Sequence, residues 1–193
     1  MKSWNFSSNG KTFEHLIDHH REPHRHYHTD QHISACLKHL DEIQDQLEKP
    51  HEVELALWFH DAIYQPFSST NEEDSAKWAA KFLEQNNANK DIIDRVENLI
   101  LITKYDGKPH GNDEEILVDI DLSILGAPTH IYDQFEENVQ KEYEKVPKFI
   151  FRRERRKILR GFLKKERLYN HPHFFEKLET QAKANLKRAI AAL

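Results

Sequence analysis

The sequence has 193 residues, with 28 Lys and Arg against 33 Asp and Glu and a formal net charge of -5. This length suits one ordinary domain, so we predict a single domain over residues 1–193 with its core at about residues 16–186. The negative net charge disfavours nucleic acid as a partner. One cysteine rules out a disulfide within the chain, and no apolar run approaches the length of a membrane span. The polar first residues lack the apolar core of a signal peptide, so we expect a cytoplasmic protein without membrane contact.

The apolar pattern predicts helices throughout the chain. Five glycines and many Leu, Ala, Glu and Lys favour helices over strands. Apolar residues recur at helical spacing, and prolines or polar turns separate the repeats. We therefore predict an all-α fold, a single compact bundle of eight or nine helices. The predicted helices cover residues 12–20, 29–47, 53–64, 72–85, 90–104, 116–125, 131–144, 148–164 and 174–192.

Capping residues and local composition refine this pattern. Thr29 or Asp30 suits the N-cap of the second helix. Gly126 suits the C′ position after the sixth. The run Leu-Ala-Leu-Trp-Phe at 55–59 is apolar on all sides and predicts a central, buried helix. The basic run at 152–157 contains one glutamate and lies in a helical pattern, so we interpret it as a solvated face.

Three polar motifs interrupt the apolar pattern. His28 and His32 are four residues apart, and they share a face if their helix begins early enough. His60 and Asp61 follow the most apolar run, where burying both is costly unless a partner such as a cation compensates them. The Asp-Ile-Asp motif at 119–121 lies among core residues and poses the same problem.

Each motif alone has a simpler interpretation. An isolated buried His-Asp pair is more often a hydrogen-bonded structural pair, and either aspartate of the third motif suits a helix cap or a solvated position. Together the motifs supply imidazole and carboxylate ligands, which suit Mn, Fe, Co, Ni or Mg, and Zn is also compatible. Such a metal polarises a phosphoryl oxygen and lowers the pKa of bound water, so that hydroxide becomes the nucleophile.

The order of these motifs resembles that of the HD superfamily of metal-dependent phosphohydrolases. The resemblance rests on a His, then His-Asp, then Asp, each on a separate helix of an all-α bundle. A fuller similarity, to a group of stand-alone bacterial predicted HD-domain hydrolases, spans about residues 16–186. It rests mainly on the segments PxRxYH at 23–28, WFHDAxY at 58–64, NExxSA at 71–76, ITK at 102–104 and DxDLxILG at 119–126.

The resemblance implies a role for each motif residue. His28 matches the first His of the Tyr-His-Asn-x-x-His segment in the cyclic-nucleotide phosphodiesterase branch, which implies that it is the general acid. The third motif matches best at Asp121, and Asp119 is then placed to orient a ligand His. The metal ligands that the resemblance implies are His32, His60, Asp61 and Asp121.

Further polar residues of the matching segments carry two interpretations each. Glu72 suits a base or the holder of a metal-bound water, or equally a carboxylate that counters a helix dipole. Asn71 suits a helix N-cap. Arg25 and Lys104 suit phosphate contacts, although placement on the surface is the simpler interpretation.

The sequence therefore predicts a metal-dependent phosphohydrolase, either a phosphomonoesterase or a phosphodiesterase. Its substrate would be a small phosphate ester, such as a nucleotide, attacked by metal-bound hydroxide. Tyr105 and Asp106 stand where the similar group often has a His, so we expect one metal rather than two. The alternative is a catalytically weak HD-type regulatory module that binds metal or ligand, and a homodimer is compatible with either. A di-iron bundle needs Glu-x-x-His on two helices, and Pro50 interrupts the single instance here.

Overall fold

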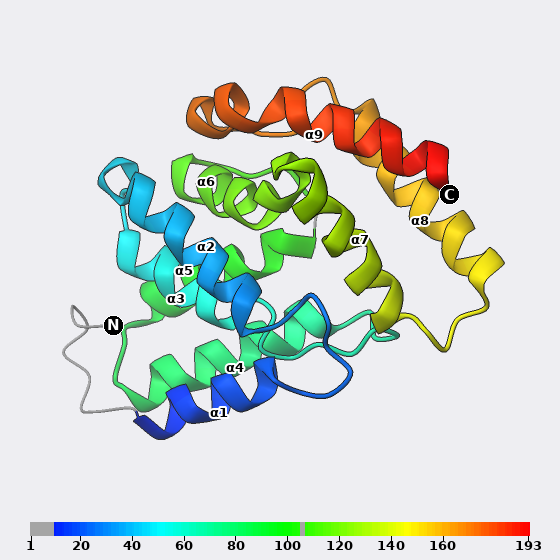
Figure 1. Ribbon diagram of the computed structural model, residues 1–193. Coiled ribbons are helices and arrows are strands. Elements are labelled where there is room, and N and C mark those ends of the chain that lie inside the picture. The colour runs from blue at the N-terminus through cyan, green and yellow to red at the C-terminus, as the bar shows by residue number, and fades with distance from the viewer. Residues whose placement is uncertain (1–9, 105–106) are drawn as a thin grey trace. The chain divides into compact units, whose positions relative to one another are not determined.

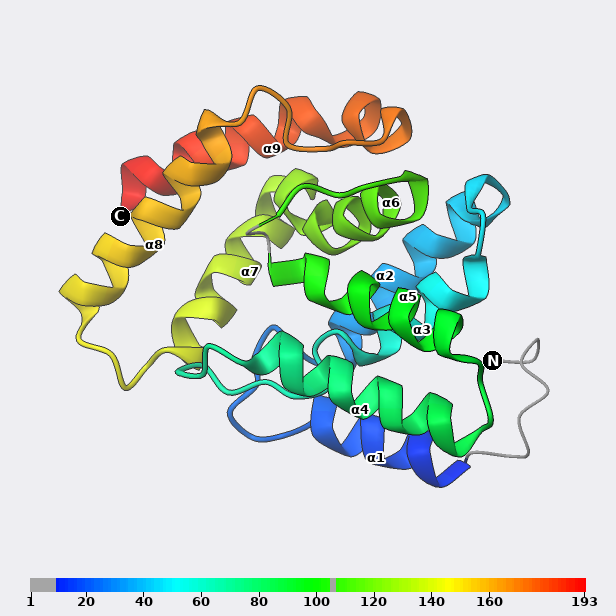
Figure 2. The same ribbon diagram turned by 180° about the vertical axis from the view of Figure 1, so that it is seen from behind.

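The computed structural model describes residues 10–104 and 107–193, and within these ranges the chain is helical without any strand (Figure 1, and from behind in Figure 2). The prediction of an all-α fold is confirmed. The expected lack of a signal peptide rests on the first residues, and the expectation of one metal rests on Tyr105 and Asp106. Residues 1–9, 105 and 106 lie outside the described ranges. The α-helices are α1 (Gly10–His20), α2 (Asp30–Ile43), α3 (Pro50–Phe59), α4 (Asn71–Gln85), α5 (Lys90–Leu101), α6 (Asn112–Asp121), α7 (Thr129–Glu142), α8 (Lys148–Lys164) and α9 (Pro172–Ala192). The 3-10 helices are η1 (Gln44–Gln46), η2 (Ile102–Lys104) and η3 (Leu122–Gly126).

The chain divides into two compact units, residues 1–118 and residues 119–193. The boundary falls inside α6, whose last three residues belong to the second unit. The single domain over residues 1–193 therefore stays a prediction. Among the helices of the described ranges, none combines the length and the apolar character that a membrane crossing needs.

The start of α2 separates the two histidines of the first motif. α2 begins at Asp30, and the Thr29 hydroxyl accepts a hydrogen bond from the Gln31 backbone amide at 3.3 Å. Thr29 is therefore the N-cap, and His28 precedes the helix. Because the N-cap backbone is extended, the condition under which His28 and His32 would share a helical face is not met.

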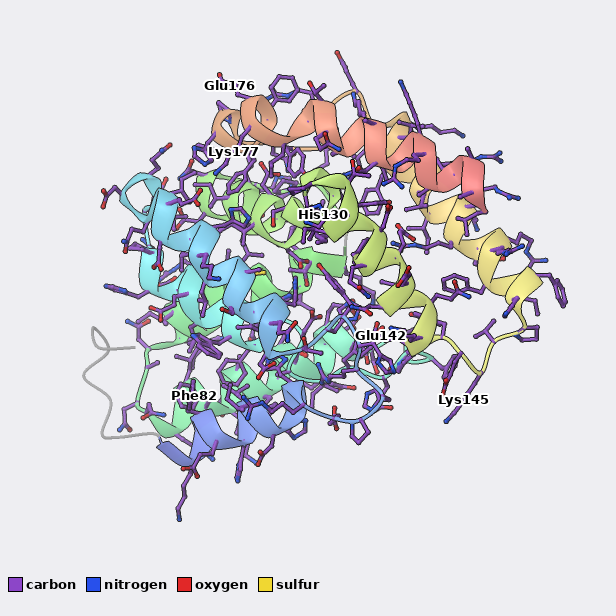
Figure 3. The ribbon with its side chains drawn as sticks, in the orientation of Figure 1. Phe82, His130, Glu142, Lys145, Glu176 and Lys177 are labelled. Atoms are coloured by element: carbon purple, nitrogen blue, oxygen red, sulfur yellow. The ribbon has the colours of Figure 1, made fainter. Side chains whose placement is uncertain are left out.

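The most buried helix is α3, which ends at Phe59 rather than at residue 64 as predicted. α2, α4 and α5 all pack against it, and residues 55–57 are at most 2% exposed. Phe82 of α4, labelled in Figure 3, lies against Phe59 with 5.6 Å between the ring centroids. The predicted central position is confirmed. The His-Asp motif at 60–61 lies in the turn after this helix and not within it.

A buried histidine docks the end of α1 onto the first unit. His20 is 0% exposed, and its Nε2 lies 3.3 Å from the Trp58 carbonyl oxygen. One residue earlier, the His19 ring lies 4.8 Å from the ring of Trp78 on α4, and both ribbon views show α1 beside α4 (Figures 1 and 2). Burial lowers the pKa of His20 from its ordinary 6.5 to about 4, because the charged imidazolium would lose its hydration.

Acid should therefore destabilise the protein through His20. In the unfolded chain this group takes up its proton near pH 6.5, and in the folded chain only near pH 4. Stability from this group is complete above pH 6.5 and is lost as the pH falls toward 4, by at most about 3 kcal/mol. The melting temperature of His20→Gln should depend less steeply on pH over this window than that of wild type. Parallel curves for the two proteins would contradict the assignment.

The second unit is organised around α9, which packs on η3, α7 and α8. Asn185 of α9 donates hydrogen bonds to the carbonyls of Leu125 and Ala127, both at 2.9 Å. Between them, a Cβ added to Gly126 would lie 2.5 Å from the Cβ and 2.9 Å from the carbonyl oxygen of Leu178. η3 ends at Gly126, but the φ of this glycine is not positive, so it does not take the left-handed conformation of a C′ glycine. Glycine is needed here because η3 approaches the α9 backbone closely.

Gly126→Ala should destabilise the protein. The new methyl group would overlap the α9 backbone, and relieving such overpacking costs about 1–3 kcal/mol. Gly161→Ala on α8 is the matched control, because a Cβ there meets nothing within 4 Å. In a helix interior this control should be neutral or stabilising by about 0.5–1 kcal/mol. Thermal unfolding of both variants checks the pair, and equal melting temperatures would refute the close-approach argument.

Candidate metal centre

Three side chains of the first unit converge beyond the end of α3. His32 Nε2 lies 3.3 Å from His60 Nε2 and 3.6 Å from Asp61 Oδ2, and His60 Nε2 lies 3.2 Å from Asp61 Oδ2. Both histidines are buried, and the Asp61 side chain is 19% exposed. Three of the four predicted ligands therefore come together, in a group that could hold a metal ion.

The triangle of donor atoms has the size of one face of a metal site. The point equidistant from atoms separated by 3.2, 3.3 and 3.6 Å lies about 2.0 Å from each. Zinc, for example, lies about 2.0–2.2 Å from histidine nitrogen and carboxylate oxygen. The spacing of the three atoms is therefore compatible with a small divalent cation. Three protein ligands leave a further coordination position for water or substrate.

A backbone contact determines which nitrogen of His60 faces the triangle. His60 Nδ1 lies 2.9 Å from the Leu57 carbonyl oxygen, which can only accept, so the Nδ1–H donates this hydrogen bond. In a neutral ring, Nε2 then carries a lone pair directed at His32 and Asp61. A lone pair beside a carboxylate is favourable only if a proton or a metal cation lies between them. A proton lies there if His60 and Asp61 form only a structural pair, and a cation lies there if they bind a metal.

The charges around the triangle shift two carboxyl groups in opposite directions. Burial acts to raise the pKa of Asp61, but positive charge on His60, His28 and His32 holds it well below its usual range. In the first turn of α4, burial raises the pKa of Glu72, and the charge of Asp61 adds to that effect. The lowered pKa keeps the Asp61 carboxylate ionised, and the raised pKa of Glu72 suits that group to proton transfer.

His28 lies beside the triangle in a cluster of aromatic rings. Its ring stacks on Tyr64 with 4.0 Å between centroids, and Tyr27 meets it edge-on at 4.9 Å. The His32 ring is 6.2 Å away. On its other side, Tyr64 stacks on His24 at 6.3 Å. These contacts fix the orientation of a half-buried imidazole next to the candidate ligands, although His28 is not part of the α2 helix.

Arg25 ties together the two segments that carry these residues. Its guanidinium donates hydrogen bonds to the carbonyls of His28, Asp61 and Ala62 at 3.1, 2.6 and 3.0 Å. It also pairs with Glu22 at 3.1 Å, and its side chain is 0% exposed. The expected surface placement is wrong, because these donors serve backbone carbonyls inside the protein. The carbonyls of residues 61 and 62 face Arg25, so this buried guanidinium holds the turn that follows α3.

Arg25→Lys should therefore weaken both the fold and the metal centre. Lysine lacks the planar fork that reaches three carbonyls at once, and unsatisfied buried groups cost about 1–3 kcal/mol. Metal affinity should fall by about 10–100-fold, as for other groups that orient ligands. Arg21→Lys is the matched control, because Arg21 pairs with Asp30 at the surface. Thermal unfolding and metal titration measure the two effects, and lowered stability with unchanged metal affinity would limit Arg25 to a structural role.

Two other residues of the matching segments hold a loop instead of facing the triangle. Asn71 is the first residue of α4 rather than its N-cap, and its amide exchanges two hydrogen bonds with the Gln65 backbone, both at 3.0 Å. Lys104 pairs with Glu73 and donates to the Ser69 carbonyl at 3.2 Å. These contacts close the loop between α3 and α4, so the phosphate contact suggested for Lys104 gains no support.

The two aspartates of the third motif lie in the second unit. Asp119 is fully buried, and its Oδ1 accepts hydrogen bonds from the backbone amide and side chain of Asn170 at 2.9 and 3.0 Å. Its Oδ2 accepts the His171 amide at 2.7 Å. This carboxylate therefore holds the loop before α9. Asp121 is half-buried at the end of α6, and its assignment as a ligand stays a prediction.

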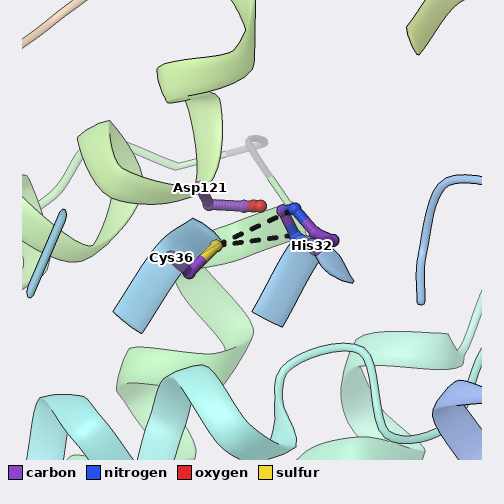
Figure 4. Close-up of side chains that lie close together, drawn as sticks. All are labelled: His32, Cys36 and Asp121. Atoms are coloured by element: carbon purple, nitrogen blue, oxygen red, sulfur yellow. Dashed lines mark hydrogen bonds between the residues drawn. The ribbon is translucent and has the colours of Figure 1, made fainter. Parts of the chain in front are cut away.

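Sequence reasoning missed the position of Cys36 beside a candidate ligand. Cys36 Sγ lies 3.8 Å from Nδ1 and 3.7 Å from Nε2 of His32, as the dashed lines in Figure 4 mark. The thiol is 1% exposed, so its prediction as a small core residue is confirmed. The spacing of four residues within one predicted helix was the signal that could have placed it against His32.

Comparisons of the chain with models of known protein families, with curated proteins and with solved structures found no match. The resemblance to the HD superfamily therefore rests on the motifs of the sequence and stays a prediction.

Proposed function

We propose that the protein is a metal-dependent phosphohydrolase that acts on a small phosphate ester, with His32, His60 and Asp61 as metal ligands. The observation that supports this most is the buried triangle of donor atoms, whose size matches the bond lengths of a divalent cation. The imidazole and carboxylate ligands suit Mn, Fe, Co, Ni, Mg or Zn. When bound, such a metal polarises a phosphoryl oxygen and lowers the pKa of a coordinated water.

The neighbouring side chains are assigned the proton transfers. His28, oriented by its stacking on Tyr64, donates a proton to the leaving oxygen of the ester. Glu72, whose pKa burial raises, holds the attacking water and accepts its proton. Asp61 stays ionised beside the histidines and supplies a negative ligand. The reaction class and the fourth ligand, Asp121, come from the resemblance to the HD superfamily.

Asp61→Asn should abolish both metal binding and hydrolysis. The amide keeps the size of the side chain but removes the charge that draws a cation into the triangle. Metal content by elemental analysis should fall from about one ion per chain to below a tenth of that. Hydrolysis across a panel of mononucleotides and sugar phosphates should fall at least about 100-fold. Asp45→Asn, which changes an exposed carboxylate of η1, is the matched control and should leave both unchanged.

Other variants and outcomes separate the parts of the proposal. His28→Asn should keep the metal and lose turnover, because His28 serves as the acid and not as a ligand. Asp121→Asn should lose metal only if Asp121 is the fourth ligand. Stoichiometric metal in wild type without turnover on any ester would favour the regulatory binding module. Failure of wild type to bind Mn, Ni or Zn after reconstitution would leave His60 and Asp61 as a buried structural pair.

A further inference from the structure

A row of cations runs along one side of α8. Arg153, Lys157, Arg160 and Lys164 follow one another at intervals of four, three and four residues, which places them on the same side of the helix. All four are exposed. With a rise of 1.5 Å per residue, the row is about 16 Å long. We call these four residues the α8 basic face.

The segment around this face concentrates the positive charge of the chain. Residues 148–167 hold ten Lys and Arg and two Glu, a net charge of +8, whereas the whole chain has a formal net charge of -5. The rest of the chain is therefore strongly acidic, with a net charge of -13. Salt screens charges beyond about 8–10 Å, so a polyanion that touches this face would respond mainly to the local charge.

Carboxylate partners are scarce around the α8 basic face. Lys157, Arg160 and Lys164 form no ion pair with any residue in the part of the chain that the structure describes. Arg153 pairs with the adjacent Glu154, and both side chains are largely exposed. On α4 and α5, by contrast, exposed lysines pair with acidic residues three or four positions away. Like charges at this spacing destabilise a helix, so the face is better suited to an external anion than to solvent alone.

An exposed aromatic ring stands at the start of the face. Phe149 lies one turn before Arg153 and is 72% exposed. Cations in a row beside an exposed aromatic ring suit a single-stranded polynucleotide, because its phosphates follow the cations and a base stacks on the ring. A lipid surface matches this arrangement less well, because a single exposed ring offers little apolar area for insertion.

We propose that the α8 basic face binds a single-stranded polynucleotide. Arg153, Lys157, Arg160 and Lys164 contact phosphates along about 16 Å of the strand, and Phe149 stacks on a base. The chain's net charge disfavours nucleic acid, but the distribution of charge in the second unit favours it at this surface. The proposal uses no residue of the metal centre and holds whether or not the phosphohydrolase function does.

Binding of a labelled single-stranded oligonucleotide of about 20 nucleotides, measured by fluorescence anisotropy, tests the proposal. The wild-type chain should bind at low salt, and the logarithm of Kd should rise with the logarithm of salt concentration with a slope near 3. Four phosphate contacts to a single strand, at about 0.7 each, give that slope. The variant R153Q/K157Q/R160Q/K164Q should bind at least about tenfold more weakly, with a flatter slope.

Two further variants separate this face from net charge and from stacking. The variant K38Q/K81Q/K108Q/K187Q removes the same charge from exposed positions elsewhere and should bind within about twofold of wild type. Phe149→Ala should weaken binding by about fivefold or more and leave the salt slope unchanged. No binding by wild type at about 50 mM salt, or equal losses in the two quadruple variants, would overturn the proposal. Binding to phosphatidylserine vesicles but not to the oligonucleotide would assign the face to lipid instead.

Discussion

The position of His60 and Asp61 at the end of a buried apolar helix is the constraint on which the first unit depends. α3 packs against α2, α4 and α5, so the turn that follows it is carried into the interior together with its polar side chains. Two residues provide partners for these polar groups inside the protein. Arg25 satisfies the carbonyls of residues 61 and 62, and His32 from α2 meets the two side chains. The turn is thus fixed by groups that are distant in the sequence, and its geometry does not depend on α3 alone.

The second unit contains a buried carboxylate that is satisfied in a different way. Asp119 accepts backbone amides from the loop before α9, which are the partners that an ionised carboxylate needs in an interior. Asp61 has imidazoles as partners instead, and one of them, His60, has its Nδ1 committed to a backbone carbonyl. Asp119 is compensated by backbone donors, whereas the partners of Asp61 are imidazole nitrogens, which can also bind a cation. This contrast adds to the support that the size of the triangle gives to the proposed metal site.

Local rules of the sequence predicted the helices well and predicted their ends poorly where distant groups intervene. α8 covers residues 148–164 as predicted, because its apolar period and the preceding proline are local signals. α3 stops five residues early, and the turn that follows it is held by Arg25, 36 residues before Asp61 in the sequence. The meeting of His32, His60 and Asp61 was implied by the resemblance to the HD superfamily. The roles of Arg25 and Cys36 did not, since neither residue type indicates by itself what it will contact.

The net charge of the sequence likewise differs from the charge that one surface of the folded chain presents. A formal net charge of -5 averages an acidic majority with a segment of +8, and only the helical register of α8 turns part of that segment into a continuous face. Glu154 interrupts the basic run in the sequence. On the helix, however, it lies on a different side from the four cations of the row. The composition therefore predicts how the molecule behaves at long range, whereas contact with a polyanion is decided by spacing along one helix.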